Sequence, residues 1–326
     1  MWDSIMKYIQ IDIKEIIVNK KYSYHVDLDV PVLIQSVKSV GIVQPLWCIP
    51  GKKFLIIDGH RRYIAAKQAC LKQLPIFSFE PVELEEIFLK ALHTHLTTQG
   101  LSIVEKLKAL KIALDSFTEN ALEEVKNLLG FNHIPGVEFL AKTIHQLPDW
   151  MITYFHGIEV SLRMLSRLLK YSFDEYQPWF HLATNLHFKG PELMTLLEQV
   201  RDIGLRDQIS AKDLFIKLEM DQLLKSPFTP QQKSQKVKNI VKSFRMPVYH
   251  HIEKRLQNIS QNVKKQIPGP IQISWDKSLE NPGIMLTLFI SHPKDYPTFV
   301  DSLNQPEIHK KIEEMLQTIS RLPQEA

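Results

Sequence analysis

The chain has 326 residues, 44% of them hydrophobic and 23% charged, which is the composition of a globular protein with a substantial core. Its net charge at pH 7 is only +4, and no apolar run approaches the ~18 residues that a membrane-spanning helix needs, so we expect a cytoplasmic protein without a membrane partner. Cys48 and Cys70 lack C-x-x-C spacing and stand among apolar residues, which predicts two reduced cysteines in the core rather than a disulfide framework.

The first hundred residues predict strands and helices in alternation. Residues 8–18 begin with strand-like alternation, and an amphipathic helix follows from about Val30 to Val40. Gly41 ends that helix at a position where a left-handed cap is favoured. The remaining elements expected here are strands at 46–49, 54–57 and 74–79, a turn at 50–53 and a helix at 83–96.

One stretch of this region carries a candidate binding site. The strand at 54–57 runs into an Asp58-Gly59 turn, and the next helix opens with His60, Arg61 and Arg62. Free backbone N–H groups and the helix dipole favour an anion at a helix N-terminus, and the arginine fork matches phosphate. The stretch therefore predicts a phosphate site, although the same pattern also fits an ordinary strand–turn–helix with solvated arginines.

A second loop, Gly41-Ile42-Val43-Gln44-Pro45, precedes this turn, and together the two loops resemble the N-terminal domain of the ParB partition-protein family. That family shows G-x-x-Q-P followed by G-E-R-R-x-x-A-A and cradles a nucleoside triphosphate, typically CTP, with both loops. The resemblance implies a ParB/sulfiredoxin-like α/β fold here, with CTP as the cofactor. The nucleotide-binding residues that it implies are Gly41, Gln44, Pro45, Gly59, His60, Arg61 and Arg62.

The chain departs from the family pattern at residues that help to hold the triphosphate and its magnesium. The glutamate of G-E-R-R is His60, and the family's E-N-x-x-R motif falls on Thr94, His95 and Thr98. The loss of acidic and amide oxygens weighs against a magnesium ion, so we expect CTP hydrolysis to be weak or absent while some phosphate affinity persists. His93 and His95 lie two apart on a predicted helix and do not face one ligand, so we predict no metal site there. The sequence shows no set of nucleophile, base and orienting residue, so we predict no catalytic residue.

Residues 101–225 predict an all-helical domain. Its first helix, at 103–117, opens with Ser102 and Glu105, whose S-x-x-E spacing is a capping box, and we favour this structural role of Glu105 over a catalytic one. The aromatic stripe at 171–180 is interpreted as core rather than as a platform for stacking bases.

A helix, a glycine-bearing turn and a second helix over residues 119–144 form a helix-turn-helix candidate. The run from 123 to 169 is similar to the central domain of the ParB family, which implies that this pair contacts DNA. The predicted contacts are His133, Lys142 and His145. Few cations are available to neutralise phosphates, so a helical core without tight DNA affinity is the alternative.

Residues 226–326 predict a small α+β module behind a polar linker at 226–235. Residues 226–270 hold nine Lys and Arg and one Glu, a balance of +8, and this basic segment either binds DNA or solvates a dimer. Two strands, 271–275 and 284–290, precede a helical stretch that ends at Ser320. Pro306 either kinks that stretch or starts a separate last helix. The DNA-binding candidates of the basic segment are Lys236, Lys238, Lys242 and Arg245.

Taken together, these patterns predict an α+β protein with a nucleotide-binding domain (1–100), a helical domain with the helix-turn-helix (101–225) and a dimerisation module (226–326). Two strands alone are marginal and their edges invite pairing, and ParB-like proteins generally dimerise at their C-termini, so we hypothesise a homodimer through this module. The leading hypothesis is a ParB-like DNA-binding protein of chromosome or plasmid partition, or of the transcription-regulator type, with CTP sensing. Its expected partners are DNA, a second copy and a partner ATPase, and retained DNA binding would place it on the nucleoid or a plasmid.

Two alternatives remain open. The first is a nucleotide-dependent phosphotransferase of the ParB-like superfamily, with Arg61 and Arg62 holding phosphate and one of His60, His93 or His95 acting as the base. The second is a degenerate interaction module without ligand binding. Sulfiredoxins share the N-terminal fold but need a cysteine in a G-C-H-R turn, and the turn here has no thiol.

Overall fold

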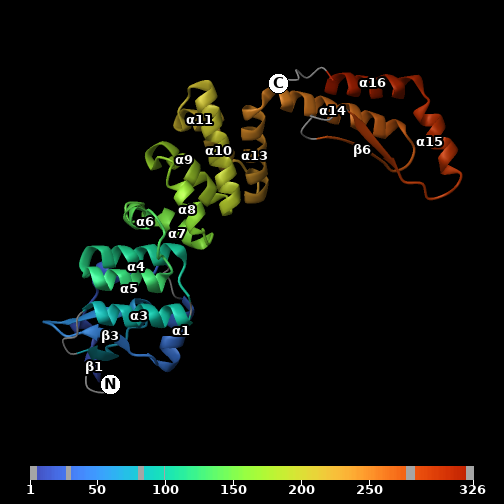
Figure 1. Ribbon diagram of the computed structural model, residues 1–326. Coiled ribbons are helices and arrows are strands. Elements are labelled where there is room, and N and C mark those ends of the chain that lie inside the picture. The colour runs from blue at the N-terminus through green and yellow to red at the C-terminus, as the bar shows by residue number, and fades with distance from the viewer. Residues whose placement is uncertain (1–5, 27–30, 80–83, 99, 277–282, 321–326) are drawn as a thin grey trace.

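The computed structural model describes residues 6–26, 31–79, 84–98, 100–276 and 283–320. Over these ranges the molecule is elongated, with an N-terminal sheet at one end, a stack of helices in the middle and a small two-stranded sheet with its helices at the other end (Figure 1). This is an α+β protein, as the sequence predicts.

Five strands form the N-terminal sheet, in the order β1-β5-β3-β4-β2. β1 (Met6–Asp12) pairs antiparallel with β5 (Gln73–Phe79), and β5 lies parallel to β3 (Leu46–Ile49). β4 (Phe54–Asp58) pairs antiparallel with β3 and parallel with β2 (Ile16–Ile17). Short 3-10 turns at Ile13–Glu15 and Lys20–Tyr22 flank β2. β4 is thus an interior strand that ends at Asp58, directly before the glycine turn.

Helices cover both faces of this sheet. α1 (Pro31–Val40) and α2 (His60–Gln68) share a buried cluster with one face, and α3 (Leu84–Thr98) packs against the other. Ile56 and Ile57 belong to opposite clusters, because neighbouring residues of a strand point to opposite faces. The left-handed cap after α1 is confirmed, since φ of Gly41 is 73°.

The central part is helical, and its first helix begins as predicted. Ser102 Oγ accepts a hydrogen bond from the Glu105 backbone N–H, and the Glu105 carboxylate accepts one from the Ser102 backbone N–H, so the capping box is confirmed. This first helix is α4 (Ile103–Ser116), and the predicted helix-turn-helix pair consists of α5 (Glu119–Leu129) and α6 (Val137–Ile144). α6 packs against α4, and the apolar side of α6 is buried as expected.

Further helices continue the stack above this region in Figure 1. They are α7 (Asp149–Gly157), α8 (Leu162–Leu168), α9 (Phe173–Asn185), α10 (Gly190–Asp207), α11 (Ala211–Lys217), α12 (Met220–Lys225) and α13 (Pro230–Arg245). The aromatic stripe is core: Trp179 and Phe180 are fully buried, and Trp179 Nε1 donates to the Ala211 carbonyl at 2.8 Å. The linker prediction is wrong, because Thr229 caps α13 and Pro230 occupies its first turn.

The C-terminal part is built from α14 (Pro247–Gln266), β6 (Ile271–Trp275), β7 (Ile284–Leu288), α15 (Asp295–Leu303) and α16 (Pro306–Ser320). The two strands are antiparallel, and α14 and α16 pack against each other. Pro306 starts a separate last helix, which decides between the two predicted roles. The predicted strand end at residue 290 is wrong by two residues. The loop between the strands lies largely outside the described residues.

Buried apolar side chains form three clusters. The largest runs from one face of the N-terminal sheet through the central helices to Val237 and Val241 of α13. The second lies between the other face of the sheet and α1 and α2, and the third joins α14, α15 and α16 to β6 and β7. The domain boundaries at 100/101 and 225/226 stay predictions.

The two cysteines have different environments. Cys48 on β3 is buried, as predicted, and burial raises the pKa of its thiol to about 12. Cys70 is exposed, so its assignment to the core is wrong: it follows the end of α2, with a positive φ of 58°. Among the described residues, no helix combines the length and the apolar character that crossing a membrane requires.

Candidate functional site

A cavity of about 570 Å³ opens where β4 ends and α2 begins. This volume falls within the range of about 300–1,000 Å³ that small-molecule sites occupy. Its lining comes from α1, the loop after α1, the β4–α2 turn, α3 and the segment before α1. Five of the seven predicted nucleotide-binding residues line it, namely Gln44, Gly59, His60, Arg61 and Arg62. The other polar or charged side chains that matter for its chemistry are His25, Asp58 and His95.

Gly59 sets the geometry of the turn at this cavity. Its φ is 97°, which an L side chain rarely adopts, and an added Cβ would lie 3.1 Å from Leu46 Cγ and 3.3 Å from Arg62 Cζ. Gly59 is also the N-cap of α2 and has no side chain to cap this end, and its own backbone N–H is hydrogen-bonded to the Asp58 carboxylate. The first backbone N–H groups of α2 are therefore available to an anion in the cavity.

Arg62 is turned into the protein rather than toward a ligand. Its Nη1 donates to the backbone carbonyls of Gln44 at 2.7 Å and Pro45 at 2.6 Å, and its Nη2 donates to Asp58 Oδ2 at 2.8 Å. The two predicted loops are thus brought together, and the Arg62 guanidinium is the clamp between them. Gly41 lies at the start of the same loop, where an added Cβ would meet no atom within 4 Å, so its role is to turn the chain.

Arg61 differs from Arg62 in its partners. It lines the cavity, and its Nε is buried without a hydrogen-bond partner among the described residues. A buried donor that lacks a partner carries a desolvation cost, which an acceptor in the cavity would remove. Of the two arginines Arg61 and Arg62, Arg61 is therefore the one that is free to bind a ligand in the cavity.

Asp58 lies at the floor of the cavity and is 7% exposed. It accepts hydrogen bonds from Arg62 Nη2 and, at 2.7 Å, from His95 Nε2 on α3. Burial alone would raise the pKa of Asp58, but the hydrogen bond from His95 and the charges of Arg62 and His95 outweigh it and lower the pKa to about 2. Asp58 is thus an ionised carboxylate at neutral pH.

His60 stands where the family pattern has glutamate, and only 4% of it is exposed. Burial lowers the pKa of His60 to about 4, so the imidazole is neutral at pH 7. Its Nε2 has no hydrogen-bond partner among the described residues. A neutral, buried imidazole cannot replace the charge of a glutamate.

Glu105 links the cavity to the helices above it. Its Oε1 lies 3.3 Å from His25 Nδ1, and its Oε2 accepts the Ser102 N–H of the capping box at 3.0 Å. Ser102 Oγ in turn lies 2.9 Å from His156 Nδ1 on α7. Burial would raise the pKa of Glu105, but the His25 and Ser102 hydrogen bonds and the nearby histidines lower it to about 2. The predicted structural role of Glu105 thus extends to holding a residue of the cavity.

The residues present fit a phosphate better than a magnesium ion. Thr94 Oγ1 donates to the Lys90 carbonyl at 2.9 Å and Thr98 Oγ1 to the Thr94 carbonyl at 2.8 Å, so both hydroxyls are bound to their own helix. Asp58 is the one carboxylate that lines the cavity within the described ranges, and Arg62 and His95 already engage it. Magnesium prefers several oxygen ligands in an octahedron, which this set does not supply.

The predicted helix-turn-helix forms a second hollow, of about 740 Å³, between α5 and α6. His133 and Lys142 line it, and His145 is exposed just beyond the end of α6. Lys126, in the same hollow, is bound by Glu123 at 2.8 Å and Glu138 at 2.5 Å. The carboxylates thus cancel much of the positive charge on this surface.

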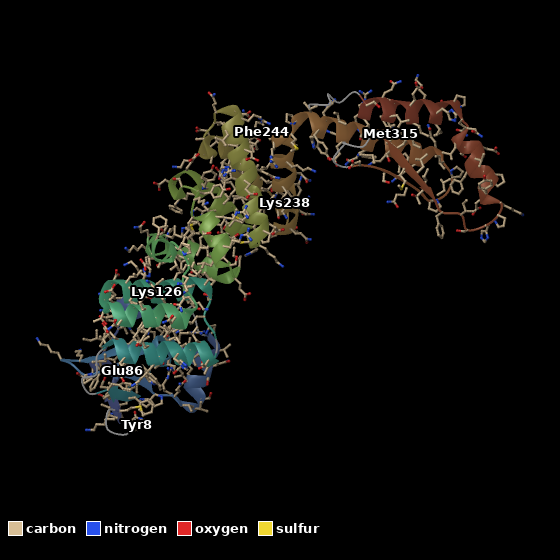
Figure 2. All side chains as sticks on the ribbon, viewed as in Figure 1. Tyr8, Glu86, Lys126, Lys238, Phe244 and Met315 are labelled. Carbon is tan, nitrogen blue, oxygen red and sulfur yellow. The ribbon has the colours of Figure 1, made fainter. Side chains whose placement is uncertain are left out.

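The basic helix α13 is turned toward acidic residues of the chain itself. Lys238 Nζ lies 2.6 Å from Glu192 Oε1, and Arg245 Nη2 lies 2.6 Å from Asp202 Oδ2, both on α10. Lys242 is 3.9 Å from Glu253, and Lys236 lies over the Phe228 ring. Figure 2 shows Lys238 on α13, well separated from Lys126 near α5. The structure therefore does not bring the two predicted DNA-binding sets together.

Sequence patterns did not identify three residues of the cavity as partners. His25, Asp58 and His95 are separated by tens of residues along the chain, and the Asp58–His95 and His25–Glu105 contacts span 37 and 80 residues. No spacing rule for helices or turns connects positions so far apart. The E-N-x-x-R motif did single out His95, but it could not identify what His95 contacts.

Comparisons with known proteins agree with the loop motifs. The family model of the ParB N-terminal domain matches residues 5–90. A probable chromosome-partitioning protein ParB of Coxiella burnetii is 33% identical over 99 residues, which are 30% of this chain and 33% of that protein. Its counterpart in Vibrio cholerae is 23% identical over 243 residues, 74% of this chain and 68% of that protein. The chain thus matches about a third of the length of the first relative and two thirds of the second.

Solved structures give similar matches with low TM-scores. C-terminally truncated Caulobacter crescentus ParB complexed with CTP-gamma-S is 19% identical, covers 51% of this chain and 93% of that one, and has a TM-score of 0.26. The same protein complexed to the centromeric parS site is 16% identical, covers 58% and 97%, and has a TM-score of 0.30.

Proposed function

Since the chain belongs to the ParB-type partition protein family, we propose that it is a partition protein that binds a nucleotide and DNA. The nucleotide is a nucleoside triphosphate, CTP by the family's loop motifs, and it binds in the N-terminal cavity. The helical part of the chain contacts the DNA. The observation that carries the proposal is the N-terminus of α2, where the N-cap Gly59 contributes no side-chain cap and the unpartnered Arg61 Nε faces the same cavity within the described residues. Backbone N–H groups and a guanidinium at one point are the usual means of holding phosphate.

Binding without efficient hydrolysis follows from the same residues. The loop carbonyls of Gln44 and Pro45 and the Asp58 carboxylate hold Arg62, so its guanidinium keeps the cavity in shape. His60 is neutral, and Thr94 and Thr98 are bound to helix carbonyls, so these positions supply no acidic group in place of the family's motif glutamates. The nucleotide then serves as a signal that is bound and released.

Replacing Arg61 by Ala is expected to weaken CTP binding by about 10- to 100-fold, because one charge-assisted hydrogen bond to phosphate is lost. Isothermal titration calorimetry of the full chain measures this, with phosphate release followed in parallel. Lys67→Ala removes the same charge from the other end of α2 and is the matched control, expected to bind as the unaltered chain does. Equal CTP affinity in Arg61→Ala, or rapid phosphate release by the unaltered chain, contradicts the proposal.

We place DNA contact on the α5–turn–α6 surface rather than on α13. The α13 cations have acidic or aromatic partners within the chain, whereas Lys142 and His133 are exposed beside the hollow. Phosphate neutralisation by lysine and arginine supplies most non-specific affinity, so a surface with one such lysine binds DNA weakly. Association with the nucleoid or a plasmid and a partner ATPase are proposed on family membership alone.

A gel-shift series in increasing salt tests this placement. Lys142→Ala is expected to reduce the slope of log affinity against log salt by about 1, because one phosphate contact is lost. Lys7→Ala removes an exposed lysine from β1, at the far end of the N-terminal sheet, and is expected to leave the slope unchanged (Figure 1). An unchanged slope for Lys142→Ala together with a reduced slope for Lys236→Ala would move the contact to α13.

We also propose that two copies of the chain associate through the C-terminal module. The sheet of β6 and β7 has two strands, and each has an open edge within the described residues. One face of this sheet packs on the module core, and the other exposes Met285, while Phe289 follows β7 and is 66% exposed. Exposed large apolar residues beside open strand edges are typical of an interface.

A further inference from the structure

Three potential metal ligands meet in the N-terminal cavity. His25, Asp58 and His95 come from the segment before α1, the end of β4 and α3, and one ligand atom of each lies within 4.8 Å of the others. Two ligands that are each about 2.1 Å from one ion are at most about 4.2 Å apart. In a tetrahedral site the ligand atoms are about 3.4 Å apart, so the three side chains need to close by up to about 1.4 Å to share a cation.

The donor set defines the class of cation. Two imidazoles and one carboxylate suit zinc and the other divalent transition metals and leave coordination positions open, whereas magnesium prefers oxygen ligands. We propose that His25, Asp58 and His95 bind a divalent transition-metal ion, with zinc as the reference ion. Nothing in the loop motifs or in the spacing of the histidines along α3 predicts this site.

The surroundings of His25 support the assignment. Its Nδ1 faces Glu105 Oε1 at 3.3 Å, which leaves Nε2 for the cation. A carboxylate on the far nitrogen of a metal-binding histidine fixes its tautomer and ring orientation and raises its basicity. Glu105 is held in turn by the capping box of α4, so the carboxylate that orients His25 is itself fixed in place.

An independent observation concerns polar atoms without partners. His60 lines the same cavity, is only 4% exposed, and has no hydrogen-bond partner for Nε2 among the described residues. Tyr24, whose ring centroid is 5.9 Å from that of His95, likewise has a buried Oη without a partner in these ranges. Buried polar groups are rarely left unpaired, so a cation with bound water in this cavity would offer His60 Nε2 a partner.

The cation would lie beside Arg61 and the N-terminus of α2. Its open coordination positions then suit a phosphate oxygen of a bound nucleotide. This phosphate contact rests on the proposed function, whereas the binding of the cation does not. The competing interpretation is that Asp58 and His95 form only a hydrogen-bonded ion pair. That interpretation requires neither His25 nor a metal, and zinc titration separates the two.

The experiment uses the full chain, freed of metal with a chelator and without an affinity tag, and titrates zinc alone by calorimetry. One equivalent is expected to bind, and His25→Ala and His95→Ala are each expected to weaken it by more than about 100-fold. Glu105→Gln keeps the capping box and is expected to weaken zinc binding by about 10- to 100-fold. His93→Ala removes an exposed histidine two positions from His95 on the same helix and serves as the matched control.

Cobalt supplies a readout that does not depend on any variant folding. Cobalt bound by nitrogen and oxygen ligands in the unaltered chain is expected to give visible absorption that zinc abolishes and a large excess of magnesium does not. Absence of stoichiometric zinc binding, or equal zinc affinity in folded His25→Ala and His95→Ala chains, overturns the proposal. CTP that binds equally well with and without chelator overturns only the phosphate contact, and zinc binding without CTP binding overturns the proposed function but leaves the metal site.

Discussion

Replacing Arg62 by Ala is expected to lower the free energy of unfolding by about 3–5 kcal/mol. The Arg62 and Asp58 side chains are only 14% and 8% exposed, and Arg62 also donates to two backbone carbonyls. Removing it leaves the buried Asp58 carboxylate with only His95 and the Gly59 backbone N–H as partners and frees the loop at Gln44 and Pro45. Breaking one half of a buried pair costs more than the pair contributes, because the other charge stays desolvated.

Urea unfolding followed by circular dichroism measures this effect. Arg61→Ala is the matched control, since it removes the neighbouring arginine, whose buried Nε has no hydrogen-bond partner among the described residues, and it is expected not to lower the free energy of unfolding. Arg62→Lys keeps the charge but not the planar fork, so its free energy of unfolding is expected to lie between those of Arg61→Ala and Arg62→Ala. Equal stabilities of Arg61→Ala and Arg62→Ala would show that Arg62 does not clamp the loops.

The double substitution of Met285 and Phe289 by Glu is expected to raise the dimer dissociation constant at least about 100-fold. Both side chains are 66% exposed in the single chain and lie on or just after β7, on the outer side of the sheet. A buried Met or Phe at the centre of an interface contributes about 2 kcal/mol or more, and a glutamate there adds the cost of desolvating a charge. The module core, which includes Met315 on α16 in Figure 2, is left intact.

Sedimentation equilibrium of the full chain at micromolar concentrations measures the association. Leu205→Glu replaces an exposed apolar residue on α10, 74% exposed and outside the module, and should sediment as the unaltered chain does. If the unaltered chain is a monomer at these concentrations, the interface does not exist. If the double variant dimerises as well as the unaltered chain, the contact lies elsewhere.

Features that depend on neighbours in the sequence were predictable. The left-handed Gly41, the capping box of Ser102 and Glu105 and the start of the last helix at Pro306 each follow from the conformational limits of a few residues. The prediction that the two loops lie together was also correct, because it came from the motif resemblance rather than from local rules. Local rules and a motif together were thus enough for the α+β class and the location of the cavity.

Features that depend on packing were not predictable in the same way. The +8 segment suggested a free basic surface, but α13 packs along α10, and its cations meet Glu192 and Asp202. Cys70 stands in an apolar stretch yet is exposed, since the helix ends just before it. The meeting of His25 with Asp58 and His95 requires the strand order of the sheet and the position of α3, which no local pattern contains.

The hydrogen bond between Glu105 and His25 connects the first turn of α4 to the cavity. The same carboxylate caps the start of one helix and orients one cavity residue, and α6 packs directly on α4. Through these hydrogen bonds and the contact of Ser102 Oγ with His156 Nδ1, one chain of contacts runs from the cavity to α4 and α7. A ligand that draws His25 toward the cavity would therefore act on the start of α4, the helix against which α6 of the α5–turn–α6 surface packs.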